Sequence, residues 1–373
     1  MKKTRILFTI PNFDTAGSGK ALLNIAKGLD ASIYDPHIMC LHNRGSFFRE
    51  VEKSGIPIHI YPYIGRSRPL WSLFKDARKT ASAFKSLAPQ IIHSFNYSAD
   101  YTEAFAARLA GIPWVFTKKN MSWSGPSGNA WKLRSYLAKK IAIQNTDMKS
   151  LFYPKSGKTV LIPRGVNTDD FCGGAVEKEI FESMNTPLHS KVLLCVANFV
   201  PVKGIELLIE AFSNLKDDFP NWNLWLVGDH QNTYGVQLQQ KVQDFHVSKR
   251  VSFSGKQLDV RPYLRAAQLF VLPTKDEGRR EGSQVALLEA MSVGVCVLGS
   301  RVPGIKDQLI NFKNHLFEPG DVSSLQNTLA VFMQLDDATL SEKGRLFSTY
   351  VQRNHDINNE IDKHHQLYQE ILK

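Results

Sequence analysis

Two glutamates eight residues apart, Glu281 and Glu289, stand in the segment 280–304, REGSQVALLEAMSVGVCVLGSRVPG. The pattern after the first glutamate predicts a helix, and eight residues make slightly more than two helical turns, so both carboxylates lie on a similar face. The first amides of such a helix have no acceptor within it and suit a diphosphate. These are the amides of Gln284, Val285 and Ala286. Glu289 is then placed for a ribose diol and Glu281 for a group beyond the phosphates. Taken alone, the pattern also fits a solvated helix face.

A second candidate anion site lies near the start of the chain, where FDTAGSGKALLNIAKGL follows the apolar run RILFTI. A P-loop requires Gly and Ser or Thr at the positions of Asp14 and Ala21, and a dinucleotide fingerprint requires Gly at Leu22, so both motifs are excluded. The remaining candidates are Gly17, Ser18 and Gly19. This glycine-rich turn either presents amides to an anion or is an ordinary strand-to-helix connection.

The elements that position these residues alternate along the chain. Short apolar strand patterns such as RILFTI, QIIHSF and PWVFTKK alternate with helical patterns in the first half, and KVLLCVANF, WNLWLVG and LFVLPT do so in the second. Such alternation predicts parallel β-α-β units. We therefore expect an α/β protein with two Rossmann-like domains facing a cleft, since ligands bind beyond the carboxyl ends of the strands. The expected boundaries are 1–170, a linker at 171–190, a second domain at 191–340, and C-terminal helices at 341–373 that pack back toward the first domain.

The charge of the chain is concentrated in its first half. The 373 residues carry a net charge of +11, but residues 1–170 hold 25 Lys and Arg against 11 Asp and Glu, whereas the rest is slightly acidic. A basic half indicates an anionic partner, either nucleic acid or a membrane surface. Basic and aromatic residues mix in segment 118–140, KKNMSWSGPSGNAWKLRSYLAKK, which favours an anionic membrane interface, although a solvated helix is the alternative. No nucleic-acid recognition motif is present, so we expect no such partner.

The cysteines and the hydropathy pattern bear on location. The four cysteines are scattered without paired or metal-type spacing, as in a reducing compartment. No apolar run approaches the roughly 18 residues of a membrane span. We therefore expect a cytoplasmic protein that is peripheral on the inner face of the cell membrane.

The ordered set of motifs resembles family 4 of the retaining glycosyltransferases, which have the GT-B architecture of two Rossmann-like domains. The pair Glu281-x7-Glu289, followed by Ala290-Met291 and Gly294, resembles the family signature. The similarity covers nearly the whole chain, because VANFVPVKGIELLIEAF, LWLVGD, VSFSGKQLDVRPYLRAAQLFVLPT, HLFEPGD and IPRGVNTDDF also match in order and spacing.

The resemblance implies roles for individual residues. It places Lys203 on the donor diphosphate, Glu281 on the donor sugar and Glu289 on the ribose. The implied catalytic residues are Glu281, Lys203, Lys119 and His93. The implied donor-binding residues are Gly17, Ser18, Gly19, Asn198, Lys203, Gly204, Gly255, Lys256, Gln284, Val285, Ala286 and Glu289. For His93, near the acceptor, a satisfied histidine at a strand end is the alternative.

Three positions depart from the family pattern. Asn198 stands where many relatives have an Arg for the diphosphate, and Lys119, or Asn120 beside it, stands where many have a His. Arg164 stands where the interdomain segment of the family often has Asn. A cation at Lys119 is our hypothesis for the missing guanidinium. Two Glu-Gly pairs, beginning at Glu277 and Glu281, compete for the first signature position. We favour Glu281, because the following helix fixes distances while the preceding loop absorbs extra residues.

The resemblance also implies the reaction. An NDP-sugar, with UDP favoured, donates a hexose or N-acetylhexosamine with retention to a hydroxyl of a lipid-linked or surface-polysaccharide acceptor. No Asp-x-Asp motif is present, so we expect neither an obligatory metal nor another cofactor. The alternative function is a catalytically weak GT-B subunit that binds a nucleotide sugar or glycan for another glycosyltransferase.

Overall fold

The computed structural model describes residues 3–14, 16–45, 47–122, 128–277 and 282–373, and it divides into two compact units. The first unit comprises Met1–Pro163 together with Ile357–Lys373, and the second comprises Arg164–Asp356. Each unit has its own sheet and its own hydrophobic core. The expected fold class, two Rossmann-like α/β domains, is therefore confirmed.

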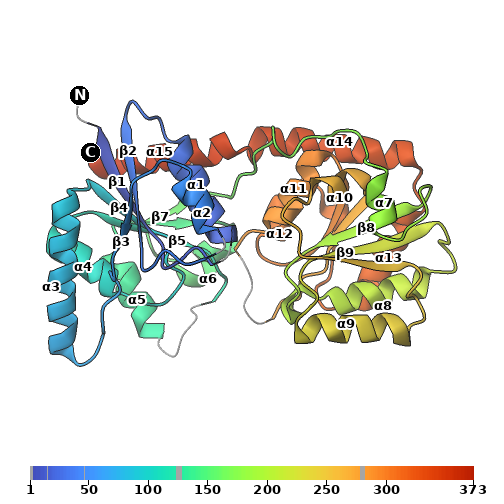
Figure 1. Cartoon of the computed structure of the whole chain (residues 1–373), viewed down its shortest axis with the longest axis horizontal. Helices are drawn as coiled ribbons and strands as arrows, with labels where there is room; N and C mark the ends of the chain where they lie inside the picture. The colour runs from blue at the N-terminus through green and yellow to red at the C-terminus, as the bar shows by residue number, and fades with distance from the viewer. Residues whose placement is uncertain (1–2, 15, 46, 123–127, 278–281) are drawn as a thin grey trace. The chain divides into compact units, whose positions relative to one another are not determined.

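A parallel sheet in the order β3-β2-β1-β4-β5-β6-β7 organises the first unit (Figure 1). Its strands are β1 (Thr4–Thr9), β2 (Tyr34–Cys40), β3 (Ile58–Ile60), β4 (Ile91–Ser94), β5 (Trp114–Lys118), β6 (Lys140–Ile143) and β7 (Thr159–Leu161). Strand β1 pairs with β2 on one side and with β4 on the other, so the strand order reverses between β1 and β4. This reversal marks the switch point at which open α/β sheets bind ligands.

The helices of the first unit include one from the C-terminal part of the chain. They are α1 (Ala16–Gly28), α2 (Phe48–Glu52), α3 (Leu70–Leu87), α4 (Thr102–Ala110), α5 (Gly128–Leu137), α6 (Thr146–Phe152) and α15 (Ile357–Leu372). Helix α15 lies beside α1 (Figure 1) and buries Leu367 and Tyr368 in the core beneath β1. Gly28 permits this contact, because a Cβ at that position would lie 2.1 Å from Cδ1 of Ile361.

The second unit has a parallel sheet in the order β10-β9-β8-β11-β12-β13. Its strands are β8 (Lys191–Val196), β9 (Trp222–Val227), β10 (Val251–Gly255), β11 (Leu269–Leu272), β12 (Cys296–Ser300) and β13 (Leu316–Phe317). Its helices are α7 (Glu179–Ser183), η1 (Pro201–Lys203), α8 (Ile205–Leu215), α9 (Thr233–Asp244), α10 (Arg261–Ala266), α11 (Val285–Val293), α12 (Ile305–Gln308), η2 (Lys313–His315), α13 (Val322–Met333) and α14 (Asp337–Asn354). Here the strand order reverses between β8 and β11, which sets a second switch point.

The division of the chain differs from the boundaries expected from the sequence. The second unit begins at Arg164, and the segment expected to be a linker belongs to this unit, since Phe171, Phe181 and Met184 are buried in its core. These apolar side chains stand among polar neighbours, which is why the segment resembles a linker in sequence. Of the helices expected to pack toward the first domain, α14 belongs to the second unit and α15 to the first.

Two further features of the chain concern its helices. The glycine-rich stretch expected as a turn is already helical, because α1 begins at Ala16 and Gly17, Ser18 and Gly19 form its first turn. In the parts of the chain that the structure describes, no helix is both long enough and apolar enough to cross a membrane.

Candidate functional site

The loops that follow β8 and β11 meet at the switch point of the second unit. The amide of Lys275 donates a 2.8 Å hydrogen bond to the carbonyl oxygen of Val202. Gly204 has a positive φ of 64°, and a Cβ there would lie only 2.2 Å from the carbonyl oxygen of Pro273. Only glycine combines this backbone conformation with so close an approach. The Lys203-Gly204 pair is therefore built into the meeting point of the two strand ends.

Lys203 extends from this loop to the start of α11. Its side chain is 6% exposed, and Nζ donates a 2.9 Å hydrogen bond to Oε1 of Gln284. Gln284 is the N-cap residue of α11, and Val285 and Ala286 belong to its first turn, whose amides have no acceptor within the helix. The predicted lysine and the predicted helix N-terminus thus lie together, as a site for a diphosphate requires.

A buried polar shell that was not predicted from the sequence supports this pair. Nε2 of Gln308, on α12, donates to Oγ of Ser283 at 3.0 Å and to the carbonyl oxygen of Gln284 at 3.2 Å. Oγ of Ser300 donates 2.6 Å to the carbonyl oxygen of Thr274. One available signal was the position of Thr274 and Ser300 at the ends of β11 and β12, where ligands of α/β sheets bind. Gln308 has no comparable signal.

Several polar atoms of this shell face no partner within the protein. Among the residues that the structure describes, Nε2 of Gln284, Oγ1 of Thr274 and Oε1 of Gln308 are buried without a hydrogen-bond partner. Buried polar groups are nearly always hydrogen-bonded in folded proteins. Three such atoms around one helix N-terminus therefore mark it as a place for a polar ligand or for ordered water.

A network of charged side chains holds the loops on either side of Lys203. Nζ of Lys275 lies 3.0 Å from a carboxylate oxygen of Glu206 and 2.6 Å from one of Glu277. The hydroxyl of Tyr234 donates to the other oxygen of Glu206 and accepts a 3.1 Å hydrogen bond from the amide of Ile205. Glu277, the competitor for the first signature position, thus pairs with Lys275.

The other predicted donor-site residues occupy the same side of the second sheet. Asn198 follows β8 and is exposed, while Gly255 ends β10 and accepts a 3.1 Å hydrogen bond from the amide of Gly228. Lys256 follows it and is exposed, and Glu289 is a half-buried residue in the middle of α11. Glu281 lies outside the described residues, as do Gly278, Arg279 and Arg280.

In the first unit, the predicted phosphate-facing residues begin α1 beside the switch point of β1 and β4. A Cβ at Gly17 would meet no atom within 4 Å, whereas one at Gly19 would lie 2.8 Å from Cδ1 of Phe13 and 3.0 Å from Cδ1 of Phe47. Gly19 is therefore needed for packing against two phenylalanines. Gly17 stands in open space, where its backbone is accessible.

His93 is a core residue with both ring nitrogens engaged. It is fully buried, and its Nδ1 lies 2.6 Å from the hydroxyl of Tyr368 while Nε2 lies 2.9 Å from Oγ1 of Thr117. Burial, followed by the charges of His364 and Lys119, holds the pKa of His93 well below 6.5. The structure thus supports the alternative of a satisfied histidine at a strand end, and a part for His93 in the reaction stays a prediction.

Lys119 follows β5 at the carboxyl edge of the first sheet. Its Nζ donates a 2.6 Å hydrogen bond to the carbonyl oxygen of Phe95 and lies 4.8 Å from the centre of the Phe95 ring. The side chain therefore joins the ends of β4 and β5 within the first unit. Its suggested contact with the donor phosphate stays a prediction.

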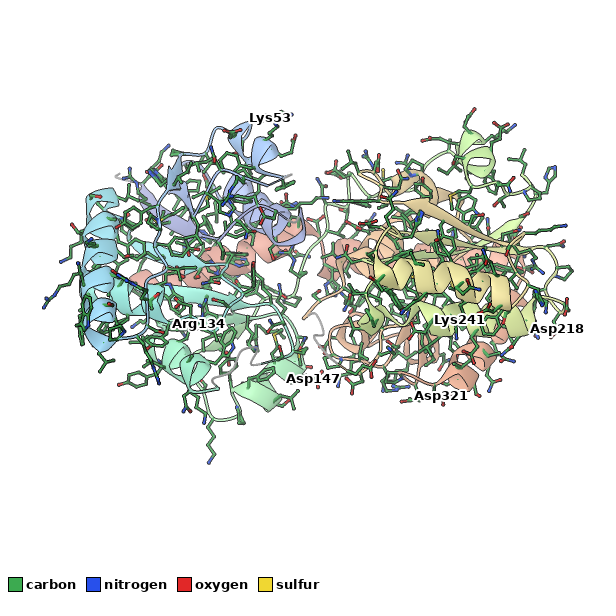
Figure 2. The ribbon with its side chains drawn as sticks, turned by 60° about the horizontal axis from the view of Figure 1, so that its bottom comes forward. Lys53, Arg134, Asp147, Asp218, Lys241 and Asp321 are labelled. Carbon is green, nitrogen blue, oxygen red and sulfur yellow. The ribbon has the colours of Figure 1, made fainter. Side chains whose placement is uncertain are left out.

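The described residues of the basic and aromatic segment 118–140 divide between the core and the surface, with Lys132, Tyr136 and Lys139 exposed. Lys118, Trp131 and Arg134 are buried. Arg134, on α5 (Figure 2), donates to the carbonyl oxygens of Asp100 at 2.6 Å and of Asn96 at 3.0 Å. Lys118 Nζ lies 4.7 Å from the Trp131 ring centre, and burial together with Arg134 lowers its pKa to about 7. Only part of the basic and aromatic character of this segment is therefore available to a partner, and its contact with a membrane surface stays a prediction.

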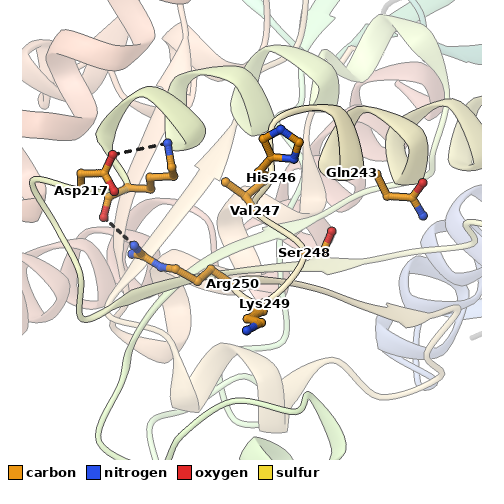
Figure 3. Close-up of a pocket in the computed structure, with 8 residues that line it drawn as sticks. Asp217, Gln243, His246, Val247, Ser248, Lys249 and Arg250 are labelled. Carbon is orange, nitrogen blue, oxygen red and sulfur yellow. Dashed lines mark hydrogen bonds and ion pairs between the residues drawn. The ribbon is translucent and has the colours of Figure 1, made fainter.

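A cavity of about 470 Å³ in the second unit lies away from these residues (Figure 3). It is lined by Lys216, Asp217 and residues 243 and 246–250, next to the first residues of β9 and β10. The guanidinium of Arg250 donates to the carbonyl oxygens of Lys216, Phe219 and Trp222. Since sheets of this type bind ligands at the opposite, carboxyl ends of their strands, we do not assign the donor to this cavity.

Two family models match the chain in succession. One described as Glycosyltransferase Family 4 matches residues 15–170, and one described as Glycosyl transferases group 1 matches residues 176–346. An uncharacterized glycosyltransferase of Haemophilus influenzae is 25% identical over 357 residues, covering 93% of this chain and 96% of that protein. The UDP-Gal:alpha-D-GlcNAc-diphosphoundecaprenol alpha-1,3-galactosyltransferase of Escherichia coli is 26% identical over 322 residues, covering 81% of each.

Solved structures share the architecture over the full length. A glycosyltransferase from Rickettsia africae superimposes with a TM-score of 0.87 at 19% identity and covers 100% of both chains. The Anabaena HepE protein, solved in complex with UDP and glucose, gives a TM-score of 0.81 at 18% identity and covers 98% of this chain and 99% of its own. At such identities these matches establish the fold.

Proposed function

The chain belongs to the family 4 glycosyltransferases with the GT-B fold, and from this premise we propose that it is a retaining enzyme. It transfers a hexose or N-acetylhexosamine from a UDP-sugar to a hydroxyl group of a lipid-linked or surface-polysaccharide acceptor. UDP is favoured because one relative is a UDP-galactose-dependent transferase and one structural neighbour was solved with UDP. The lipid-linked acceptor is favoured because that relative acts on a diphosphoundecaprenol.

The observation that carries the proposal is the Lys203–Gln284 pair at the start of α11. A leaving diphosphate develops negative charge, and a buried ammonium beside free helix amides stabilises such charge without reorganisation. The unpartnered Nε2 of Gln284 supplies a further donor at the same place. In this proposal Lys203 and the amides of Val285 and Ala286 bind the diphosphate, and Glu289 binds the ribose.

Three further parts of the proposal concern the donor sugar, the proton of the acceptor hydroxyl and the need for a metal ion. Glu281 positions the donor sugar, and the leaving phosphate itself accepts the proton of the acceptor hydroxyl, so that no dedicated general base is needed. We also propose that no metal ion is required, since the sequence has no Asp-x-Asp motif. Transfer that survives a chelator would support this part, and transfer restored only by a divalent cation would overturn it.

A thermal-shift screen tests the donor site directly. The protein is titrated with UDP, GDP, ADP, ATP, NAD and their sugar conjugates, in parallel with Glu289→Ala. A ligand at about 100 times its Kd adds roughly 2.7 kcal/mol of stability, which is readily seen as a rise in Tm. We expect UDP to raise Tm and Glu289→Ala to weaken the effect. A shift with ATP or NAD alone would contradict the proposed donor class.

The product distinguishes the enzyme from a binding subunit. Sugar transfer by the intact protein, lost in Glu281→Ala and Lys203→Met, supports the enzyme, and the anomeric configuration of the product reports retention or inversion. UDP binding without transfer to any lipid-linked or polysaccharide acceptor would favour the catalytically weak subunit instead, for which the exposed Asn198 at a usual arginine position is the supporting feature.

A further inference from the structure

Helix α3 of the first unit carries an apolar patch on its outer face. Leu70 is 66% exposed, Trp71 64% and Phe74 47%, all within the first five residues of the helix. Large apolar side chains that are exposed singly are common, but three together on one helix face form a patch that calls for an explanation. The patch is not needed to hold α3 in place, because other residues of this helix are already buried against the protein.

The adjoining face of α3 packs on the protein. Leu73, Ala77 and Phe84 are buried, and α3 packs against α4 (Figure 1). Phe74 reaches only the edge of this contact, with its ring centre 5.6 Å from that of Phe105 on α4. Trp71 therefore points away from the core, because it lies on the opposite side of the helix from Leu73 and Phe84.

Cationic side chains surround the apolar patch. The exposed basic residues of this stretch are Arg66, Arg68, Lys75, Arg78 and Lys79. The only acidic residue between positions 61 and 87 is Asp76, which accepts hydrogen bonds from the amide and the guanidinium of Arg66 at 3.2 and 3.3 Å. The surface formed by residues 66–79 of α3 and the preceding loop is thus strongly positive around an apolar centre; we call it the α3 surface.

We propose that the α3 surface binds the interface of an anionic lipid bilayer. An amphipathic helix with Trp, Phe and Leu at the acyl boundary and Lys and Arg at the headgroups is the arrangement that such an interface favours. Nucleic acid also attracts the cations, but it leaves exposed aliphatic side chains such as Leu70 without an apolar environment. This surface goes beyond the proposed transfer reaction and is a different membrane-facing element from segment 118–140, whose exposed residues serve as the control below.

Vesicle co-sedimentation tests the proposal with two variants of the whole protein. In one, Trp71→Ser and Phe74→Ser remove the apolar contacts, and in the other, Arg78→Gln and Lys79→Gln remove two cations. The matched control is Tyr136→Ser with Lys132→Gln and Lys139→Gln, exposed residues in and just after α5. The vesicles contain phosphatidylcholine alone or with phosphatidylglycerol. Tm and the UDP-induced shift are measured for every variant.

We expect wild-type protein to bind only the anionic vesicles and to dissociate as salt is raised. The variant without Arg78 and Lys79 should bind roughly 25-fold more weakly, since each cation contributes roughly fivefold. The variant without Trp71 and Phe74 should bind at least about tenfold more weakly, because it loses two buried apolar contacts. Tm and the UDP shift should stay unchanged in both. The control should bind like wild type. The proposal would be overturned if the α3 variants bound vesicles as well as the control variant, or if the wild-type protein did not bind anionic vesicles. It would also be overturned if the α3 substitutions altered only the oligomeric state of the protein and left vesicle binding unchanged. Vesicle binding without any UDP shift would leave the α3 surface standing and overturn the proposed function alone.

Discussion

The ammonium group of Lys203 and the side-chain amide of Gln284 are joined by a 2.9 Å hydrogen bond across 81 residues of sequence. The lysine comes from the loop after β8 and the glutamine caps α11 after β11, so the pair connects the two strands between which the sheet order reverses. An anion bound by the lysine is therefore also within the field of the α11 N-terminus.

Replacing Lys203 should weaken UDP binding. We expect Lys203→Met to raise the Kd for UDP by about 10- to 100-fold, because a hydrogen bond to a charged group is worth roughly 1.5–3 kcal/mol. Isothermal titration measures the change. Lys249→Met, which replaces an exposed lysine two residues before β10, is the matched control and should bind like wild type. Equal Kd values for the two variants would remove Lys203 from the donor site.

Gly204→Ala should destabilise the second unit more than an alanine at another left-handed glycine. Gly204 and Gly320 have φ values of 64° and 79°, but only at Gly204 would the new Cβ meet a backbone oxygen, that of Pro273 at 2.2 Å. Left-handed backbone costs a non-glycine residue about 1–3 kcal/mol, and the overpacking adds a similar amount. Thermal unfolding of both variants checks this. A Tm that falls no further for Gly204→Ala than for Gly320→Ala would contradict the close approach.

Arg134→Met should destabilise the first unit severely. The buried guanidinium donates hydrogen bonds to the carbonyl oxygens of Asp100 and Asn96. It also lies near the buried Glu103, whose pKa is raised by burial although the charge of Arg134 acts to lower it. Removing one partner of a buried charge pair costs about 3–5 kcal/mol. Urea unfolding followed by tryptophan fluorescence measures the loss. Lys132→Met, exposed on the same helix, should change stability by less than about 0.5 kcal/mol.

The second unit should lose stability in acid through His315. Burial lowers the pKa of this histidine to about 4, although Nδ1 donates a 2.8 Å hydrogen bond to the carbonyl oxygen of Val297. The unfolded chain therefore binds the proton first as the pH falls, so stability is lost between about pH 6.5 and 4, by about 3 kcal/mol in total. The free energy of unfolding, measured by denaturation at each pH, should change less across this window for His315→Asn than for wild type. The exposed His189→Asn should keep the wild-type slope, and an unchanged slope in His315→Asn would contradict the assignment.

Local patterns predicted the strands and the donor-site helix, because apolar runs and capping positions depend on neighbours along the chain. The Lys203-Gly204 pair was found in the same way, since it directly follows a strand. The partners of buried polar groups were not predictable, because they depend on pairing at long range. His93 meets Tyr368 275 residues later, and Gln308 supports Gln284 from a short helix without a distinctive sequence. In segment 118–140, composition does not reveal which side of α5 faces the sheet, so the buried Trp131 and Arg134 could not be told from the exposed Lys132 and Tyr136.

The return of α15 to the first unit has a consequence for the order in which the chain acquires structure during synthesis. The second unit is continuous, from Arg164 to Asp356, and α15 follows it. On the ribosome, the whole second unit emerges before Leu367 and Tyr368 can fill the core beneath β1. The first unit is thus synthesised first but completed last. Until α15 packs, its sheet exposes apolar surface of the kind that chaperones bind.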